Sequence, residues 1–187
     1  HYPTTAPVYG MAVSDSRVLA TQGRGGVTVL DWDRSEKTLR AAGKWPLSIQ
    51  FARDLAFLDR RHVILSDTFG HSALTVRVKG GAGARLISYA AIPSLNVDHV
   101  TLVEKVGYIT ARDQVSVVDY RRPRYPRMIG VLWRGPEGKV NNCVLRGNAL
   151  FVLRDTAGVD IYDVSDPRKP VFVAHSDALG AVSTMAF

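Results

Sequence analysis

The residues of this sequence best suited to chemistry stand directly before short apolar triplets. They are one arginine, two carboxylates, one imidazole and one amide: Arg53, Asp54, Asp98, His99 and Asn142. Carboxylates beside a histidine are the side chains that move protons or hold a metal ion. Because 44 residues separate Asp54 from Asp98, and another 44 separate Asp98 from Asn142, these groups meet only if a repeating fold brings those positions together.

The other motifs add no catalytic or metal site. The histidines occur singly, without HxH or HExxH spacing, so no metal site is predicted. The single cysteine, Cys143, lies in the apolar run CVL and is interpreted as a buried thiol. Without a CxxC or CxxCH motif, structural zinc and covalently attached haem are unsupported, and no cofactor is expected. Asp67, His71 and a nearby Ser66 or Ser72 are triad residue types without a nucleophile elbow, so no catalytic residue is assigned.

The chain repeats itself at a period of 40 to 47 residues. An apolar triplet starts at intervals of 44, 45, 43 and 42 residues, at Met11, Leu55, Val100, Cys143 and Met185. A second type of apolar run starts at intervals of 47, 41 and 44 residues, at Val27, Leu74, Val115 and Val159. Self-similarity at this period is the signature of a repeat fold.

Each repeat unit is written in short apolar runs separated by Gly, Asp, Asn, Ser and Pro, which is typical of strands and turns. No stretch of a dozen residues has the 3.6-residue period of a helix. Four runs in a unit of about 44 residues predict an all-β fold, a β-propeller of four-stranded antiparallel blades. We expect a single domain with blades at about 8–47, 48–95, 96–138 and 139–180, and a lone inner strand at 181–187.

Two of the units carry a more specific pattern. VDIYDVSDPRKPVFVA, from Val159, and VSVVDYRRPRYPRMIG, from Val115, resemble the LVIVD repeat of bacterial β-propeller proteins. VTVLDWDRSEKTLRAAG keeps the strand and the aspartate without the prolines, and LTVRVKGGAGARLISYA has Val78 in place of the aspartate. We expect Asp31, Asp119 and Asp163 to accept hydrogen bonds from turn N–H groups. The resemblance implies a propeller fold and no particular chemistry.

The ends of the sequence bear on the size of the ring. Residues 1–7, HYPTTAP, resemble the outer strand of a preceding blade, and residues 181–187, AVSTMAF, the inner strand of a following one. Since a propeller must close or leave sheet edges exposed, two alternatives remain. The four blades belong to a larger propeller of five to eight blades, whose remainder is cleaved off or on another chain, or they form a compact ring of four. We favour the first, in which the chain is processed or excised.

The chain is basic, with a formal net charge of +7. Its densest basic segment has four arginines within seven residues: Arg121, Arg122, Arg124 and Arg127. This segment is either a binding site for a polyanion or a solvated turn at an exposed sheet edge. We take the second interpretation, and nucleic acid is not the expected partner.

Two classes of function fit these observations. The first is a non-catalytic scaffold for protein–protein interaction or assembly, whose partner is another protein or the remaining blades on another chain, because the lone strand can complete another sheet. The alternative is an enzyme or enzyme subunit with a site at the central channel mouth, where Arg53, Asp54, Asp98 and His99 would converge. Residues at this position also commonly hydrogen-bond the neighbouring blade, which is the structural interpretation.

The expected location follows from the resemblance. LVIVD-type propellers are typical of exported bacterial proteins, which implies the periplasm or the cell surface. No apolar run approaches the 18 residues that a membrane span requires.

Overall fold

The structure is a computed structural model of the chain, and it describes residues 6–15, 17–134, 139–178, 180–182 and 185. Sixteen strands form four antiparallel four-stranded sheets, and the described residues include no helix. The all-β propeller expected from the sequence is confirmed. No helix long and apolar enough to cross a membrane occurs in the described part of the chain.

Each sheet is one blade, and its strands follow one another in chain order. Blade 1 consists of β1 (Gly10–Ser14), β2 (Arg17–Thr21), β3 (Val27–Asp33) and β4 (Thr38–Lys44). Blade 2 consists of β5 (Ala52–Asp59), β6 (His62–Asp67), β7 (Ser72–Val78) and β8 (Ala84–Ala91). Blade 3 consists of β9 (Val97–Val103), β10 (Val106–Ala111), β11 (Gln114–Asp119) and β12 (Arg127–Arg134). Blade 4 consists of β13 (Val140–Arg146), β14 (Ala149–Arg154), β15 (Val159–Asp163) and β16 (Val171–Ser176).

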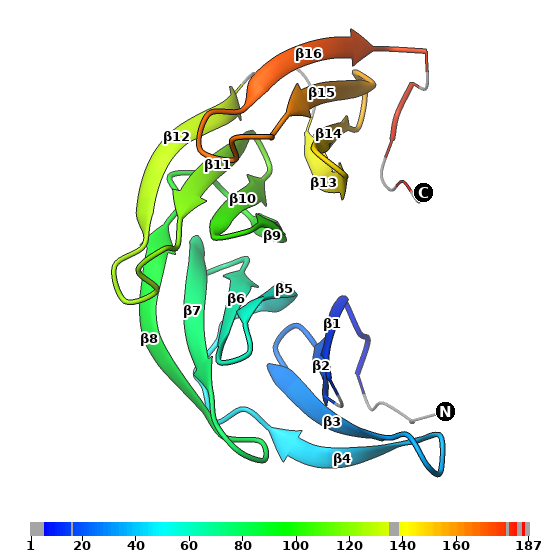
Figure 1. Ribbon diagram of the computed structural model, residues 1–187, viewed down its shortest axis with the longest axis vertical. Coiled ribbons are helices and arrows are strands. Elements are labelled where there is room, and N and C mark those ends of the chain that lie inside the picture. Colours follow the sequence, from blue (N-terminus) through cyan, green and yellow to red (C-terminus); the bar gives the residue numbers. More distant parts are fainter. Residues whose placement is uncertain (1–5, 16, 135–138, 179, 183–184, 186–187) are drawn as a thin grey trace.

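The four blades stand side by side along an open arc (Figure 1). The first strands, β1, β5, β9 and β13, line its concave side, and the last strands, β4, β8, β12 and β16, form its convex side. Residues of the first strands therefore face the position of a central channel.

The hydrophobic core lies between successive blades. Leu19 and Val29 of blade 1 cluster with Leu55 and Leu65 of blade 2, and the same arrangement recurs between blades 2 and 3 and between blades 3 and 4. Successive side chains of a strand point to opposite faces of the blade, and each face packs against a neighbouring blade. Both faces are therefore apolar, and the strands read as nearly continuous apolar runs with little alternation of apolar and polar residues. Stacking of blades is therefore the principal source of hydrophobic burial.

The recurring apolar triplet explains why Cys143 is buried. Its first residue is buried between blades in three units, with exposures of 3% for Leu55, 6% for Val100 and 4% for Cys143. Burial raises the pKa of the Cys143 thiol to about 12. Since the thiolate is the reactive form of cysteine, Cys143 is a packing residue, as the sequence predicted.

Hydroxyl groups on the second strands connect each blade to the next. Thr21 on β2 donates to the carbonyl oxygen of Arg53 at 2.7 Å, and Ser66 on β6 donates to that of Asp98 at 3.0 Å. Thr110 on β10 donates to the sulfur of Cys143 at 3.4 Å. The inner strands are thus fixed by polar contacts as well as by packing.

Two of the three repeated aspartates accept turn hydrogen bonds as predicted. Asp119 accepts from the backbone N–H of Arg121 at 2.9 Å, and Asp163 from that of Ser165 at 2.8 Å. For Asp31 the prediction was wrong: β3 continues to Asp33, which accepts the turn N–H groups instead. Asp31 forms an ion pair with Arg17 at 3.6 Å, and the strand runs two residues beyond it.

Asp119→Asn should make folding less sensitive to acid. Hydrogen bonds and the nearby Arg121 and Arg168 lower the pKa of Asp119, although its burial acts in the opposite direction. A carboxyl with a lowered folded-state pKa contributes stability above its unfolded value near 3.8, and loses it as the pH falls through the folded value. We expect the variant to be about 1 to 2 kcal/mol less stable at pH 6, with the difference shrinking toward pH 2. Urea unfolding at both pH values measures this, and a pH-independent difference would contradict it.

The expected lone strand at 181–187 lies partly outside the described residues. Of this segment the structure describes Ala181, Val182 and Met185, and assigns no strand to them. The N–H of Val182 donates to the carbonyl of Arg154 at 3.1 Å, just as that of Val140, the first residue of β13, donates to the carbonyl of Arg112 at 3.1 Å. Val182 therefore lies beside the end of β14 much as the first residue of β13 lies beside the end of β10.

Candidate functional site

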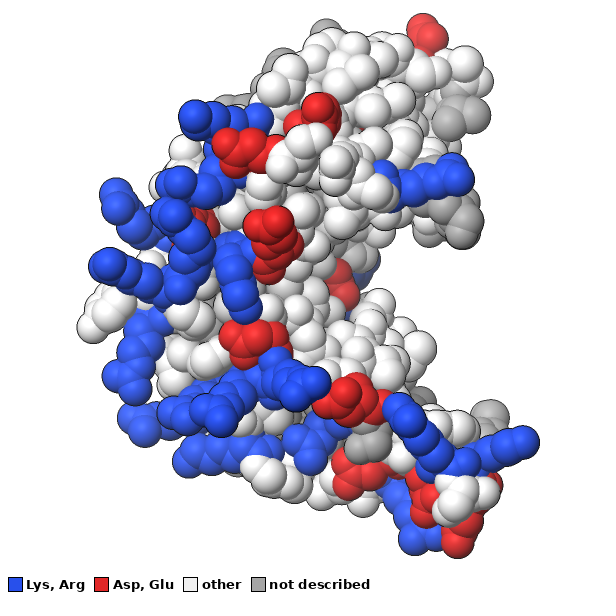
Figure 2. Space-filling model, viewed as in Figure 1, with Lys and Arg blue, Asp and Glu red and all other residues white. Residues whose placement is uncertain are grey.

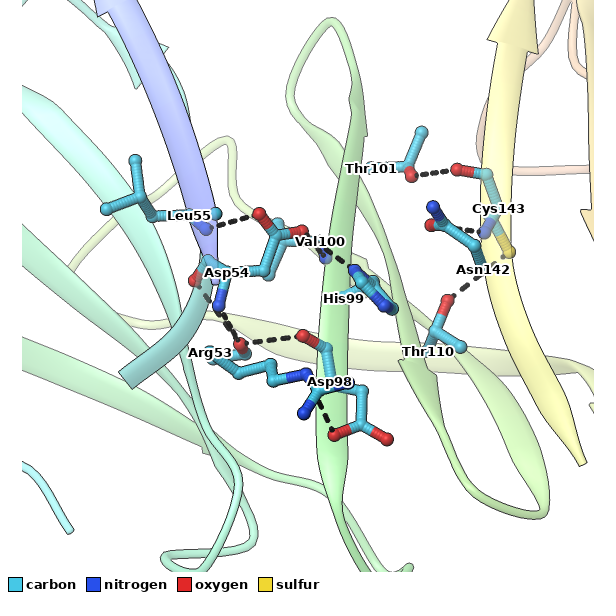
Figure 3. Close-up of polar contacts among 12 residues, drawn as sticks. Arg53, Asp54, Leu55, Asp98, His99, Val100, Thr101, Thr110, Asn142 and Cys143 are labelled. Carbon is cyan, nitrogen blue, oxygen red and sulfur yellow. Dashed lines mark hydrogen bonds and ion pairs between the residues drawn. The ribbon is translucent and has the colours of Figure 1, made fainter. Parts of the chain in front are cut away.

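The predicted channel-mouth residues lie on β5, β9 and β13, and four of the five come together. Arg53 and Asp54 on β5 face Asp98 and His99 on β9 (Figure 3). Arg53 Nε lies 3.8 Å from Asp98 Oδ1, and His99 Nδ1 lies 3.4 Å from Asp54 Oδ2. The blade repeat therefore places these side chains together, although 44 residues separate the two carboxylates in sequence.

Asp54 makes the contacts of a structural connector. One carboxylate oxygen accepts the backbone N–H of Leu55 at 2.8 Å, and the other accepts that of Val100 on the next blade at 3.0 Å. With His99 nearby, both oxygens are engaged by protein groups, as Figure 3 shows. Asp54 thus connects the inner strands of blades 2 and 3, in agreement with the structural interpretation of this position.

Asn142 lies on blade 4, apart from the other four. Its side-chain oxygen accepts the N–H of the following residue, Cys143, at 2.8 Å. This repeats the bond between Asp54 and Leu55, so the two side chains are counterparts in the repeat. Asn142 does not line the hollow described next.

A small hollow of about 160 Å³ opens beside Asp98. Three of the predicted residues line it, Arg53, Asp98 and His99, together with Asn141, which also flanks an inner-strand triplet. The other lining residues are ones that sequence reasoning did not single out: Asn96, Arg112, Lys139 and Val140. Arg112 follows the second strand β10 and Lys139 precedes the inner strand β13, so both are loop residues. The strand register places Arg112 at the position of Asp155, one residue after Arg154, so the repeat gave no signal for a cation there.

The hollow has the electrostatics of a small-anion site. It holds three cationic side chains, Arg53, Arg112 and Lys139, and one carboxylate, Asp98. Burial raises the pKa of Asp98, and the charges of Arg53 and His99 act in the opposite direction. A carboxyl of this kind can exchange a proton with a bound molecule. Within the described ranges no group of three potential ligands is placed to hold a metal ion.

The structure separates the four arginines of the predicted polyanion segment. Arg121 is held by Asp119, with its Nη2 atom 2.8 Å from the carboxylate. Arg124 instead lines a second hollow with residues of blade 2. Arg122 and Arg127 are exposed. The segment is therefore a turn with one neutralised arginine, rather than a continuous patch of four.

Comparison with known proteins gives structural matches alone. No family model and no curated protein matches the chain. A functionally unknown protein from Desulfotomaculum acetoxidans matches with a TM-score of 0.72 at 8% identity, over 92% of this chain and 57% of that one. A 6-phosphogluconolactonase-type protein from Bacteroides uniformis matches with a TM-score of 0.67 at 12% identity, over 89% of this chain and 53% of that one.

The periplasmic gluconolactonase of Pseudomonas aeruginosa matches with a TM-score of 0.71 at 12% identity, over 100% of this chain and 60% of that one. The fold is a β-propeller. At these identities the matches establish the fold and no activity. The chain spans between half and three fifths of the length of these three proteins.

Proposed function

We propose that this chain is a scaffold whose two end blades bind further propeller blades supplied by another chain. The observation that carries the proposal is Met11 on β1, whose side chain is 66% exposed. The equivalent residues Leu55, Val100 and Cys143 are at most 6% exposed because a preceding blade covers each of them. Val13, on the same face of β1, is 68% exposed.

The other end of the arc has the complementary face. Ile161 on β15 is half-buried, whereas its counterparts Val29 and Val117 are at most 3% exposed against the next blade. Blade 4 therefore carries the type of face that covers a residue such as Met11. The chain already packs one blade against the next three times, and its two end blades carry the two faces that such a contact requires. A second copy can therefore place its blade 4 against blade 1 of the first. Buried apolar area is the driving force expected for such an assembly.

The proposal includes a location. The turns after β11 and β15 carry the LVIVD-like residues, and the resemblance supports an exported bacterial protein at the periplasm or the cell surface. One structural match is named as periplasmic, which is compatible with that location.

The scaffold proposal predicts self-association of this chain. Light scattering on the purified protein at rising concentration should detect species of at least twice the chain mass of 20.5 kDa. Met11→Asp/Val13→Asp should remain at the mass of a single chain, because two carboxylates would be buried without partners. Leu95→Asp/Tyr125→Asp, at two apolar side chains exposed elsewhere, is the matched control and should associate like the parent. A parent that stays monomeric, or a control that dissociates equally, would overturn the proposal.

A second candidate function is an enzyme site at the channel mouth. The hollow beside Asp98, with its three cations, favours a small organic anion, and two of the structural matches bear the names of lactonases. Hydrolysis of gluconolactone that is lost in Arg112→Ala would favour this candidate over a purely non-catalytic scaffold.

A further inference from the structure

A groove of basic residues runs across blade 2, from the β5–β6 turn to the β11–β12 turn of blade 3. Two adjoining hollows of about 440 and 240 Å³ share Arg77 and Lys79 in their linings. Figure 2 shows Lys and Arg side chains gathered there, over β7, β8 and the β11–β12 turn. We define the basic groove by its six exposed cations: Arg60, Arg61, Arg77, Lys79, Arg85 and Arg124.

The cations of the basic groove are not neutralised by the protein. Neither hollow has a carboxylate in its lining. Among the described residues none of the six side chains forms an ion pair, in contrast to the neighbouring Arg17, which lies 3.6 Å from Asp31. The groove is therefore a locally positive surface, and such a surface attracts anions.

The strand register adds to the concentration of charge. Arg77 on β7 is directly opposite Arg85 on β8. Like charges placed directly across a strand pair destabilise a sheet. Because no carboxylate of the groove offsets this repulsion, an anionic ligand would relieve it.

The groove suits a chain of anionic groups better than a single ion. Its cations come from the β5–β6 turn, β7, the β7–β8 turn, β8 and the β11–β12 turn. Aliphatic side chains lie between them: Val78, Leu86 and Ile87. No aromatic side chain lines either hollow, so a nucleic acid would lack the base stacking that usually supports single-strand binding.

We propose that the basic groove binds a linear acidic polysaccharide. Guanidinium groups bind sulfate and carboxylate groups through paired hydrogen bonds, and the aliphatic residues offer contact to the C–H faces of sugar rings. None of the six cations lines the hollow at the channel mouth, and the site does not depend on the proposed assembly.

Fluorescein-labelled heparin is the probe for this proposal. Arg77→Gln/Arg85→Gln should raise the Kd of the full chain for heparin roughly tenfold or more, because two charge-assisted contacts are lost. Arg24→Gln/Lys169→Gln removes the same charge at exposed positions of blades 1 and 4 and should change the Kd less than about twofold. Circular dichroism and melting curves establish that both variants fold.

Three outcomes would overturn the proposal. The parent could fail to bind heparin in low salt, or both double variants could lose binding equally, which would indicate a response to net charge. A duplex or single-stranded oligonucleotide could also bind more tightly than heparin and displace it, which would identify the groove as a nucleic-acid site. Loss of binding in Arg60→Gln/Arg61→Gln, across the groove from Arg85, would support the proposal independently.

Discussion

Gly158→Ala should destabilise the protein by about 4 kcal/mol, a large fraction of the stability of an ordinary domain. Gly158 precedes β15 and has a φ of +73°, a conformation that costs an L-residue roughly 1 to 2 kcal/mol. A Cβ at this position would lie 2.0 Å from the carbonyl oxygen of Ser176 and 2.8 Å from the Cα of Asp177. Both obstacles are backbone, so the end of β16 would have to move.

Gly26 is the matched control for this prediction. It holds the same place in blade 1, directly before β3, with a φ of +74°, but no atom lies within 4 Å of its ideal Cβ. Gly26→Ala should therefore cost only the conformational penalty, roughly 1 to 2 kcal/mol. Urea unfolding of both variants separates the steric cost from the backbone cost. Equal losses of stability would show that the backbone of β16 at Ser176 moves aside at little energetic cost.

The comparison of Gly26 with Gly158 illustrates what the sequence could predict of the fold. The repeat period and the strand content could be predicted because the same positions are buried in successive blades. Leu55, Val100 and Cys143, for example, are buried at one equivalent position. The sequence could not predict that Gly158 is crowded and Gly26 is not, since this depends on how far β16 extends past the turn. The repeat motif also predicted Asp31 as the turn aspartate of blade 1, whereas Asp33 accepts the turn N–H groups. The prediction failed because strand length is set by cross-strand pairing and not by the motif.

The sequence predicted where the side chains of the candidate site lie, but not what each of them contacts. The repeat sufficed to bring Asp54 and Asp98 to adjacent inner strands. Asp54 stands one residue before Leu55, and Asp98 stands two residues before Val100. The period alone could not show that Asp54 accepts the backbone N–H of Val100 while Asp98 lines a hollow. Arg112 and Lys139 were missed because loop residues carry no periodicity.

Asp54→Ala should cost about 2 to 3 kcal/mol, because it leaves the N–H groups of Leu55 and Val100 without their acceptor. Asp54→Asn retains an oxygen acceptor and should cost less. The loss should appear as weaker cohesion between blades 2 and 3, measurable as faster hydrogen exchange at Val100. Unchanged exchange at Val100, with a full loss of stability, would contradict the role as a connector between the blades.

Asp98→Asn is the matched comparison at the neighbouring carboxylate, and we expect the opposite sign. Asp98 has no backbone N–H to satisfy among the described contacts, and its pair with Arg53 at 3.8 Å is partly exposed and weak. Because its pKa is raised in the folded state, the ionised form disfavours folding above that pKa, and the penalty disappears below the unfolded value near 3.8. The variant should therefore be as stable as the parent or slightly more stable at pH 7, and the gain should vanish at pH 3. A variant that loses as much stability as Asp54→Ala would show that Asp98 also connects the blades, and would remove the case for a binding site beside it.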